Sequence, residues 1–433
     1  MDIDDKLKQM EQELEKKTRE LERKLDEGLG GSTAKKEATP ATQARAFKAR
    51  DLSGKHNFLV NMSREKFLGR LDEIMEEDFN IRSFFGKSMS AYPTVFCETP
   101  REIISPLLAA EDWPDAAKEG YIAEQERIAA TGQTPPGIGF LGYHLPGVGC
   151  FINGWGIAND MGLEPRQVLD DPVGFGQVVN TAAHEKWGHG FISEITSTGV
   201  DKQSVQLNLL DIVSRFKLRD VDTPQRAKLM EQHVILFESS VLLEEGFATW
   251  TERWLAESMA EREQKWAHLP DSAPIYTPEE VAGTFRSIGQ DNWARSVECL
   301  FPAHEPSPDQ VHEILQEHWP PFIEALNGAD EVFAAGRMQP PPYVIGFLML
   351  NYLAQRQGAK CVPYAVATAA NVSYGLENVS NHDLRNFVNN NPDLNLNRRF
   401  LSLMYLHPGR PNDVGEFLGR CREEAGLAPP APK

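Results

Sequence analysis

The sequence predicts an α+β fold that is predominantly α-helical, with a small β-sheet ahead of a central helix. Three observations support this fold class. Apolar residues recur at helical spacing over 67–79 and over much of the chain after residue 171. Asp171-Pro172 and Thr223-Pro224 are typical helix starts, with a capping side chain followed by proline in the first turn. Between the first helices and residue 171, the glycine-rich stretch 137–146 favours short strands and turns.

The N-terminal stretch differs from the rest of the chain. Leu7, Leu14 and Leu21 recur every seven residues within 1–27, a short and imperfect heptad pattern. This pattern fits a coiled coil that forms a homodimer or binds a partner protein, and it fits a solvated amphipathic helix equally well. Residues 28–45, rich in Gly, Ser, Thr, Ala and Lys, predict a flexible linker.

The remaining chain is predicted to contain three segments. Its length of 433 residues, 41% of them hydrophobic, is enough for a sizeable core and for two or three domains. The segments are a helical region followed by a small β-sheet at 46–165, metal-binding helices at 166–290, and a helical C-terminal region at 291–433.

The amino-acid composition excludes some classes of binding partner and indicates a cellular compartment. A net charge of −19 argues against nucleic acid and anionic membranes, both of which need a basic surface. No apolar run reaches the roughly 18–20 residues that cross a bilayer, and the first residues are charged, unlike a signal core. The five cysteines are scattered without a CxxC pair, which is typical of free thiols in a reducing compartment. We therefore expect a cytoplasmic protein.

The glycine-rich stretch satisfies a GxGxxG pattern from Gly137 to Gly142. A dinucleotide fingerprint must open a helix, and Pro146 would break that helix in its first turns. Short strands running on through Val148 to Trp155 are therefore expected, with an edge strand within 138–157.

The central motif is His184-Glu185-Lys186-Trp187-Gly188-His189. Two histidines that hold a metal, with a glutamate that takes a proton from water, are the groups used by zinc hydrolases. The histidines are five residues apart, and on an ideal helix they would point roughly 140° away from each other. A single π-bulge within 184–189 restores a shared face, and Gly188 is a suitable place for the distortion.

A second motif is the acidic pair Glu244-Glu245 in the helical stretch 242–250. The pair followed by Gly-Phe-Ala resembles the glutamate-ligand motif of the gluzincin metallopeptidases, the clan of thermolysin and the neutral aminopeptidases. The resemblance implies that Glu245 binds zinc and that Glu244 orients a ligand histidine. The histidine spacing resembles that of dipeptidyl peptidase III. Thr249 and Glu252, one and two turns beyond Glu245, could line the site, but a structural role is favoured.

A third motif, Pro-Tyr-x-x-Gly at the start of 342–353, resembles a segment of the neutral aminopeptidase family. By that resemblance the hydroxyl of Tyr343 stabilises the oxyanion. In gluzincins the edge strand of a preceding sheet binds the substrate main chain, and 138–157 is expected to do so here. The aminopeptidases carry an acidic signature on that edge, whereas 151–155 has no acidic residue, which counts against aminopeptidase specificity.

The motifs together predict a zinc metallopeptidase that hydrolyses a peptide or protein. One Zn²⁺ per chain is held by His184, His189 and Glu245 and lowers the pKa of a water molecule. Glu185 acts as general base and Tyr343 stabilises the oxyanion. Zinc is preferred over iron or manganese for a triad of nitrogen and carboxylate ligands with an open position.

Two alternatives belong to other classes of protein. One is a catalytically inactive binding protein in which the metal joins two helices, with a coiled coil at residues 1–27. Glu185 and Tyr343 argue against it, because such a structural metal site needs neither. The other is a coiled-coil interaction protein whose histidines bind no metal.

Overall fold

The computed structural model describes one compact unit of the chain, which lies within Asn57–Lys433. The predicted coiled coil at 1–27 and the predicted linker at 28–45 lie outside the described residues, and so do residues 200–222. The described residues are 64–79, 87–109, 114–199, 223–319, 338–370 and 394–405, with single positions between 322 and 336 and residue 419.

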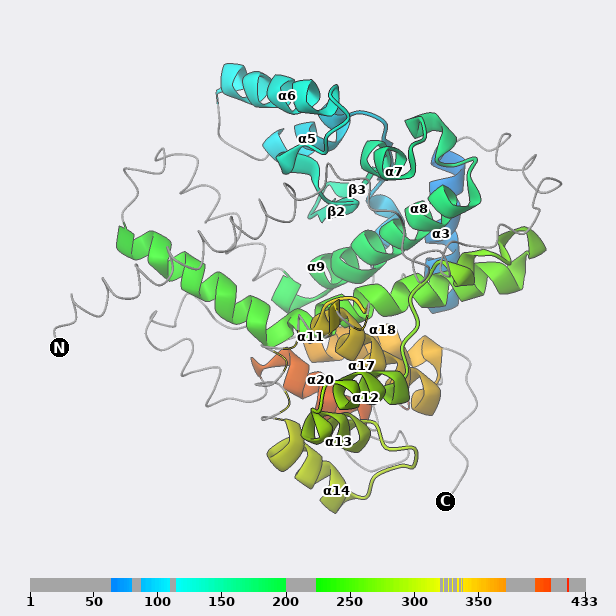
Figure 1. The fold of residues 1–433 in the computed structure, drawn as a ribbon, viewed down its shortest axis with the longest axis vertical. Coiled ribbons are helices and arrows are strands. Elements are labelled where there is room, and N and C mark those ends of the chain that lie inside the picture. Colours follow the sequence, from blue (N-terminus) through cyan, green and yellow to red (C-terminus); the bar gives the residue numbers. More distant parts are fainter. Residues whose placement is uncertain are drawn as a thin grey trace. The chain divides into compact units, whose positions relative to one another are not determined.

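Helices dominate the described residues, and a three-stranded sheet accompanies them, as the α+β prediction requires (Figure 1). The elements up to the end of the central helix are α3 (Arg64–Phe79), η2 (Met89–Ala91), β1 (Thr94–Cys97), α5 (Pro100–Ala109), α6 (Asp115–Ala129), η3 (Pro136–Ile138), β2 (Gly142–Leu145), β3 (Gly149–Asn153), α7 (Gly154–Met161), η4 (Pro165–Gln167), α8 (Pro172–Ala182), η5 (Ala183–Gly190) and α9 (Phe191–Ile195). The later elements are α11 (Thr223–Arg262), η6 (Gln264–Trp266), η7 (Leu269–Asp271), α12 (Pro278–Ser287), α13 (Asp291–Leu300), α14 (Pro308–Glu313), η8 (Ile314–His318), α17 (Pro341–Gln357), η9 (Ala359–Cys361), α18 (Val362–Ala370) and α20 (Leu396–Met404).

The sheet has the strand order β1-β3-β2, so β2 is an edge strand. β3 pairs in parallel with β1 and antiparallel with β2. One face carries Phe151 and Tyr143, which pack with residues of α5 and α6 in a small separate core. The other face carries Cys150 and Ile152, which join the main core around the central helix. The strands predicted within 138–157 are therefore confirmed.

The central helix begins where the sequence predicts. The Asp171 side chain accepts hydrogen bonds from the main-chain N–H groups of Val173 and Gly174, and Pro172 occupies the first turn. α8, η5 and α9 follow one another without interruption to Ile195. The sheet and this helix are in contact through β2 and β3.

α11 is the longest described helix, with 40 residues from Thr223 to Arg262. The sequence predicts a periodic stretch from Thr223 towards Trp266 that breaks at least once, whereas α11 runs without interruption to Arg262 and η6 begins at Gln264. No proline follows Pro224 within it. Gly246 lies inside the helix, but it is buried against α17, and α11 also packs on η5, α3 and α20. Tertiary contacts thus stabilise a helix that local preference alone would interrupt.

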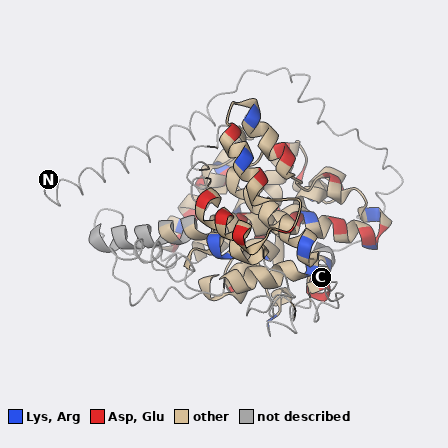
Figure 2. Cartoon of the chain, turned by 90° about the horizontal axis from the view of Figure 1, so that it is seen from below, with Lys and Arg blue, Asp and Glu red and all other residues tan. Residues whose placement is uncertain are grey.

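The main core draws residues from all three predicted segments, from Leu68 in α3 to Tyr405 after α20. Acidic and basic residues are interspersed along the described helices (Figure 2), with exposed ion pairs such as Arg101–Glu119. Within the described part of the chain, no helix combines the length and apolarity that crossing a bilayer demands.

Candidate metal centre

The two histidines of the central motif share one face of their helix. Residues Ala183–Gly190 have π-helical hydrogen bonding, which confirms the predicted widening of the helix within 184–189. Nε2 of His184 lies 3.2 Å from Nε2 of His189, and the ring centroids are 4.9 Å apart. The five-residue spacing therefore brings both imidazoles to one point.

α11 supports the widened turn from the opposite side. The hydroxyl of Thr251 lies 3.1 Å from the main-chain oxygen of Ala183, at the start of the π-helix, and 2.7 Å from that of Ala248. Gly188 allows the two helices to approach closely, because a Cβ atom on it would lie 2.4 Å from the Cα of Ala248. The predicted role of Gly188 as a permissive residue thus extends to helix packing.

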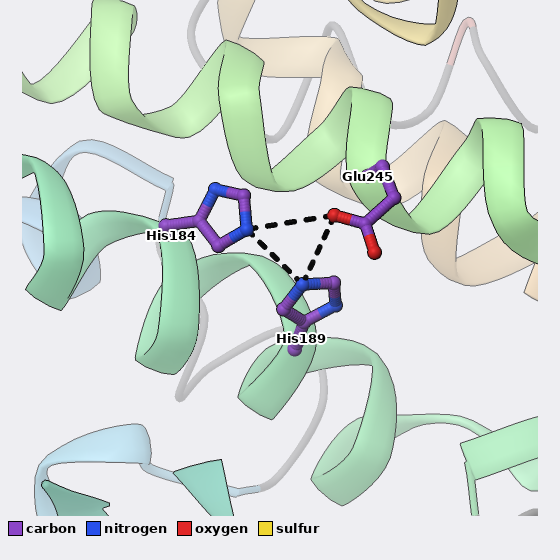
Figure 3. Close-up of side chains that lie close together, drawn as sticks. All are labelled: His184, His189 and Glu245. Atoms are coloured by element: carbon purple, nitrogen blue, oxygen red, sulfur yellow. Dashed lines mark hydrogen bonds and ion pairs between the residues drawn. The ribbon is translucent and has the colours of Figure 1, made fainter. Parts of the chain in front are cut away.

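The close contact with α11 brings Glu245 to the histidines. Figure 3 shows the three side chains pointing toward one another, with Oε2 of Glu245 3.5 Å from Nε2 of His184 and 3.4 Å from Nε2 of His189. These distances are long for hydrogen bonds, and the buried Oε2 has no hydrogen-bond partner among the described residues. Zinc bonds of about 2.0–2.1 Å in a tetrahedron place donor atoms about 3.3–3.4 Å apart. The three atoms therefore fit three corners around a zinc ion.

The carboxylate that orients His184 comes from Glu252. Its Oε1 lies 2.7 Å from Nδ1 of His184, and the side chain is buried. Glu252, two turns beyond Glu245, points to the same side of α11 and takes this role for His184. That Glu244 orients a ligand histidine stays a prediction. The structural role favoured for Thr249 is confirmed, since its hydroxyl donates to the main-chain oxygen of Glu245.

α17 brings Tyr343 next to the histidines. Its ring is stacked on that of His184, with centroids 5.8 Å apart and planes 14° apart. The helices carrying Glu245 and Tyr343 meet at the glycines of their motifs, because a Cβ atom on Gly246 would lie 2.3 Å from the carbonyl carbon of Gly346. The two glycines therefore determine how closely Tyr343 approaches the ligand set.

A buried charge pair fixes the central helix on a third side. Asp72 of α3 accepts hydrogen bonds from Nζ of Lys186 at 2.6 Å and from Nε1 of Trp187 at 3.1 Å. All three side chains are buried. Both donors belong to the π-helix η5. Asp72 therefore fixes η5 against α3.

Burial and charge set the protonation of the site in the metal-free protein. Burial raises the pKa of Glu185 above its ordinary value, although the nearby histidines oppose the shift. Burial also raises the pKa of Glu245, but the histidines outweigh it and leave that pKa well below the usual range. Burial lowers the pKa of His184, but the neighbouring carboxylates of Glu245 and Glu252 outweigh burial and raise that pKa to about 10. A base with a raised pKa beside an ionised ligand suits general acid–base chemistry near neutral pH.

The edge strand lies against the central helix. A Cβ atom on Gly142 would lie 2.6 Å from Cγ2 of Thr181 and 3.3 Å from Cγ of Glu185, so the strand passes directly beside the predicted base. His144 follows Gly142 by two residues in the same strand. A Cβ atom on Gly190 would lie 2.7 Å from Nδ1 of His144. The predicted edge strand, the base and the ligands thus form one site.

The sequence named Glu252 as a residue that could line the site but not as the partner of His184, which lies 68 residues away in the chain. Sequence reasoning missed two other residues beside the central helix. Asp72 and His144 gave no signal, because only the tertiary fold brings them to the central helix.

Comparison with known proteins adds no relative: no family model matches the chain, and neither a curated protein nor a solved structure matches it. The resemblance to gluzincins therefore rests on the motifs and on the arrangement of their side chains.

Proposed function

We propose that the protein is a zinc-dependent metallopeptidase of the gluzincin type, with a small sheet before the active-site helix and a helical C-terminal region. The observation that carries the proposal is the convergence of two imidazole nitrogens and one buried carboxylate oxygen, 3.2–3.5 Å apart, from motifs distant in sequence. A base and a tyrosine beside these atoms favour an enzyme over a structural metal site.

The residues divide the work of peptide hydrolysis. Zn²⁺ held by His184, His189 and Glu245 would supply Lewis acidity and lower the pKa of a water molecule. Glu185 accepts the proton of the attacking water and then donates it to the nitrogen of the leaving amine. The hydroxyl of Tyr343 donates a hydrogen bond to the carbonyl oxygen of the scissile bond as negative charge develops on it.

The substrate is a peptide or protein segment in extended conformation. Among the described residues, no strand pairs with the outer edge of β2, which lies beside Glu185, and an extended chain can add to such an edge through main-chain hydrogen bonds. A reducing compartment such as the cytoplasm fits Cys97, Cys150 and Cys299, which are free thiols.

The test is a Glu185→Gln variant assayed on an unbiased peptide library. We expect the wild-type protein to bind one zinc ion, measured by mass spectrometry of the metal, and to cleave library peptides. The variant should keep its zinc and lose cleavage by at least about 100-fold, because only the proton transfer is removed. Glu298→Gln, an isosteric change at an exposed ion pair with Arg286, is the matched control.

Two outcomes would contradict the proposal. Undiminished cleavage by Glu185→Gln would remove the mechanism. A wild-type protein that binds zinc tightly and cleaves no library peptide would favour the alternative, a binding protein in which the metal joins η5 to α11.

A further inference from the structure

A second buried pair of a histidine and a carboxylate lies behind the edge strand. Nε2 of His144, in β2, lies 3.0 Å from Oε1 of Glu194, in α9. The two side chains are only 2% and 9% exposed. This pair is separate from the ligand set, since neither residue belongs to the metal-binding group.

Glu194 holds the strand at more than one point. The same oxygen that contacts His144 accepts a hydrogen bond of 2.7 Å from the main-chain N–H of Gly147, in the turn after β2. The hydroxyl of Tyr92 also donates to this carboxylate. Burial raises the pKa of Glu194, but these hydrogen bonds outweigh burial and leave the pKa below its ordinary value. An ionised carboxylate on the helix thus fastens both β2 and its turn.

Packing alone does not account for a histidine here. Nδ1 of His144 is buried without a hydrogen-bond partner among the described residues, and it faces Gly190, where a Cβ atom would lie 2.7 Å away. An apolar side chain would fill this space without leaving a nitrogen unsatisfied. The hydrogen bond to Glu194 is therefore the contribution that distinguishes histidine from an apolar residue.

The main chain of His144 faces the edge of β2 that no strand of the described residues covers. The N–H of Asn153 donates to the main-chain oxygen of Leu141, so these opposed residues form a hydrogen-bonded pair. Such pairs alternate along antiparallel strands, which directs the main-chain groups of Tyr143 toward β3 and those of Gly142 and His144 outward. His144 thus anchors its side chain to the helix and presents its main chain at the edge.

We propose that His144, Glu194 and Gly147 form an edge clamp that fixes the outward main chain of β2 relative to the metal-binding helix and so positions an extended ligand. His144 and Glu194 are positioning residues in this arrangement. The inference rests on the proposed function, because it assigns the edge to a peptide bound at the metal.

Two hydroxamates distinguish binding at the edge strand β2 from binding at the metal. Acetohydroxamate binds zinc but is too short to pair with a strand, whereas acetyl-trialanine hydroxamate carries main-chain groups that can pair with β2. Dissociation constants are measured by calorimetry on zinc-loaded protein, with His144→Leu removing the clamp and His144→Gln retaining an amide donor. Tyr143→Phe is the matched control, because it removes a hydrogen bond to Ile103 on the opposite face of the same strand.

We expect His144→Leu to weaken the trialanine hydroxamate about tenfold, as loss of a hydrogen bond to a charged group implies, and to leave acetohydroxamate within about twofold. His144→Gln should recover at least about half of this loss on a logarithmic scale, and Tyr143→Phe should leave the ratio of the two constants unchanged. For any peptide that is cleaved, KM should rise with little change in kcat, because the edge binds ground state and transition state alike.

Other outcomes show whether the edge clamp or the proposed function is wrong. A His144→Leu protein with the wild-type ratio of constants would overturn the clamp, and so would equal effects of His144→Leu and Tyr143→Phe. If His144→Leu does not fold, Glu194→Gln takes its place, and an unchanged ratio there overturns the clamp as well. If acetohydroxamate fails to bind the wild-type protein, the proposed function fails. Amide hydrogen exchange then decides the clamp, and exchange at Tyr143 and Leu145 that is no faster in the variant overturns it.

Discussion

The contact between Gly246 and Gly346 can be tested by adding a single methyl group. In Gly346→Ala the new Cβ would lie 2.1 Å from the main-chain oxygen of Leu242 and 2.5 Å from the Cα of Gly246. Carbon atoms in contact are normally separated by about 3.5 Å, so α11 and α17 must move apart by about 1 Å. That movement carries Tyr343 away from Glu245, but it leaves Glu245 beside the histidines of η5.

On the proposed function, Gly346→Ala is expected to give a slow enzyme that still binds zinc. Misplacement of a catalytic group by about 1 Å can cost about 100-fold in rate, so kcat should fall by up to that factor. Overpacking should lower the free energy of unfolding by about 1–3 kcal/mol, offset by a gain in helix propensity of up to about 1 kcal/mol. Zinc content should stay at one ion per chain.

Two comparison variants locate the effect. Gly188→Ala separates η5 from α11 instead, because its Cβ would lie 2.4 Å from the Cα of Ala248, and this variant should lose zinc affinity. Gly283→Ala, in α12, has open space around the added methyl group and should change neither kcat nor zinc affinity. Metal analysis, steady-state rates and urea unfolding measure all three. A Gly346→Ala protein with kcat within about twofold of wild type would refute the reasoning.

Three further changes probe other contacts. Glu252→Ala removes the partner of His184 and should raise the dissociation constant for zinc about 10–100-fold in competition with a chelator; an unchanged constant would contradict the assigned role. Asp72→Asn leaves the buried ammonium of Lys186 unpaired and should lower the free energy of unfolding by about 3–5 kcal/mol, with most of the loss recovered in D72N/K186M. Zinc must displace a proton from His184, whose pKa is raised to about 10 in the metal-free protein. Below that pH, zinc affinity should therefore rise with pH, by about tenfold per unit for one displaced proton, and calorimetry in buffers of different ionisation enthalpy should detect proton release. Affinity that does not change with pH would count against this assignment.

Relations between side chains on one helix could be predicted from the sequence, because the number of residues between two side chains fixes the angle between them. The five-residue interval between His184 and His189 required a widened turn, and Ala183–Gly190 has one. The start of the central helix followed from Asp171-Pro172 for the same local reason. Glu252 was visible on the face of Glu245, yet its role depended on a histidine elsewhere in the chain.

Contacts between distant segments could not be predicted, because they depend on how helices cross. Asp72 reaches Lys186 across 114 residues, and His144 reaches Glu194 across 50. The continuity of α11 was also missed, since its stability comes from neighbours and not from its own sequence. Gly246 and Gly346 stood out within their motifs, but their mutual contact is a property of the folded chain.

Glu245 and Glu252 lie on one uninterrupted helix, and this has a consequence for how metal would enter and leave. The Glu245 carboxylate lies beside the imidazole nitrogens that would hold the metal, and the Glu252 carboxylate contacts His184 at Nδ1. Rotation of α11 about its axis shifts both carboxylates together. Metal binding and release would then involve both residues in one step. No long-lived species would form in which Glu245 still binds the cation and His184 has dissociated from it.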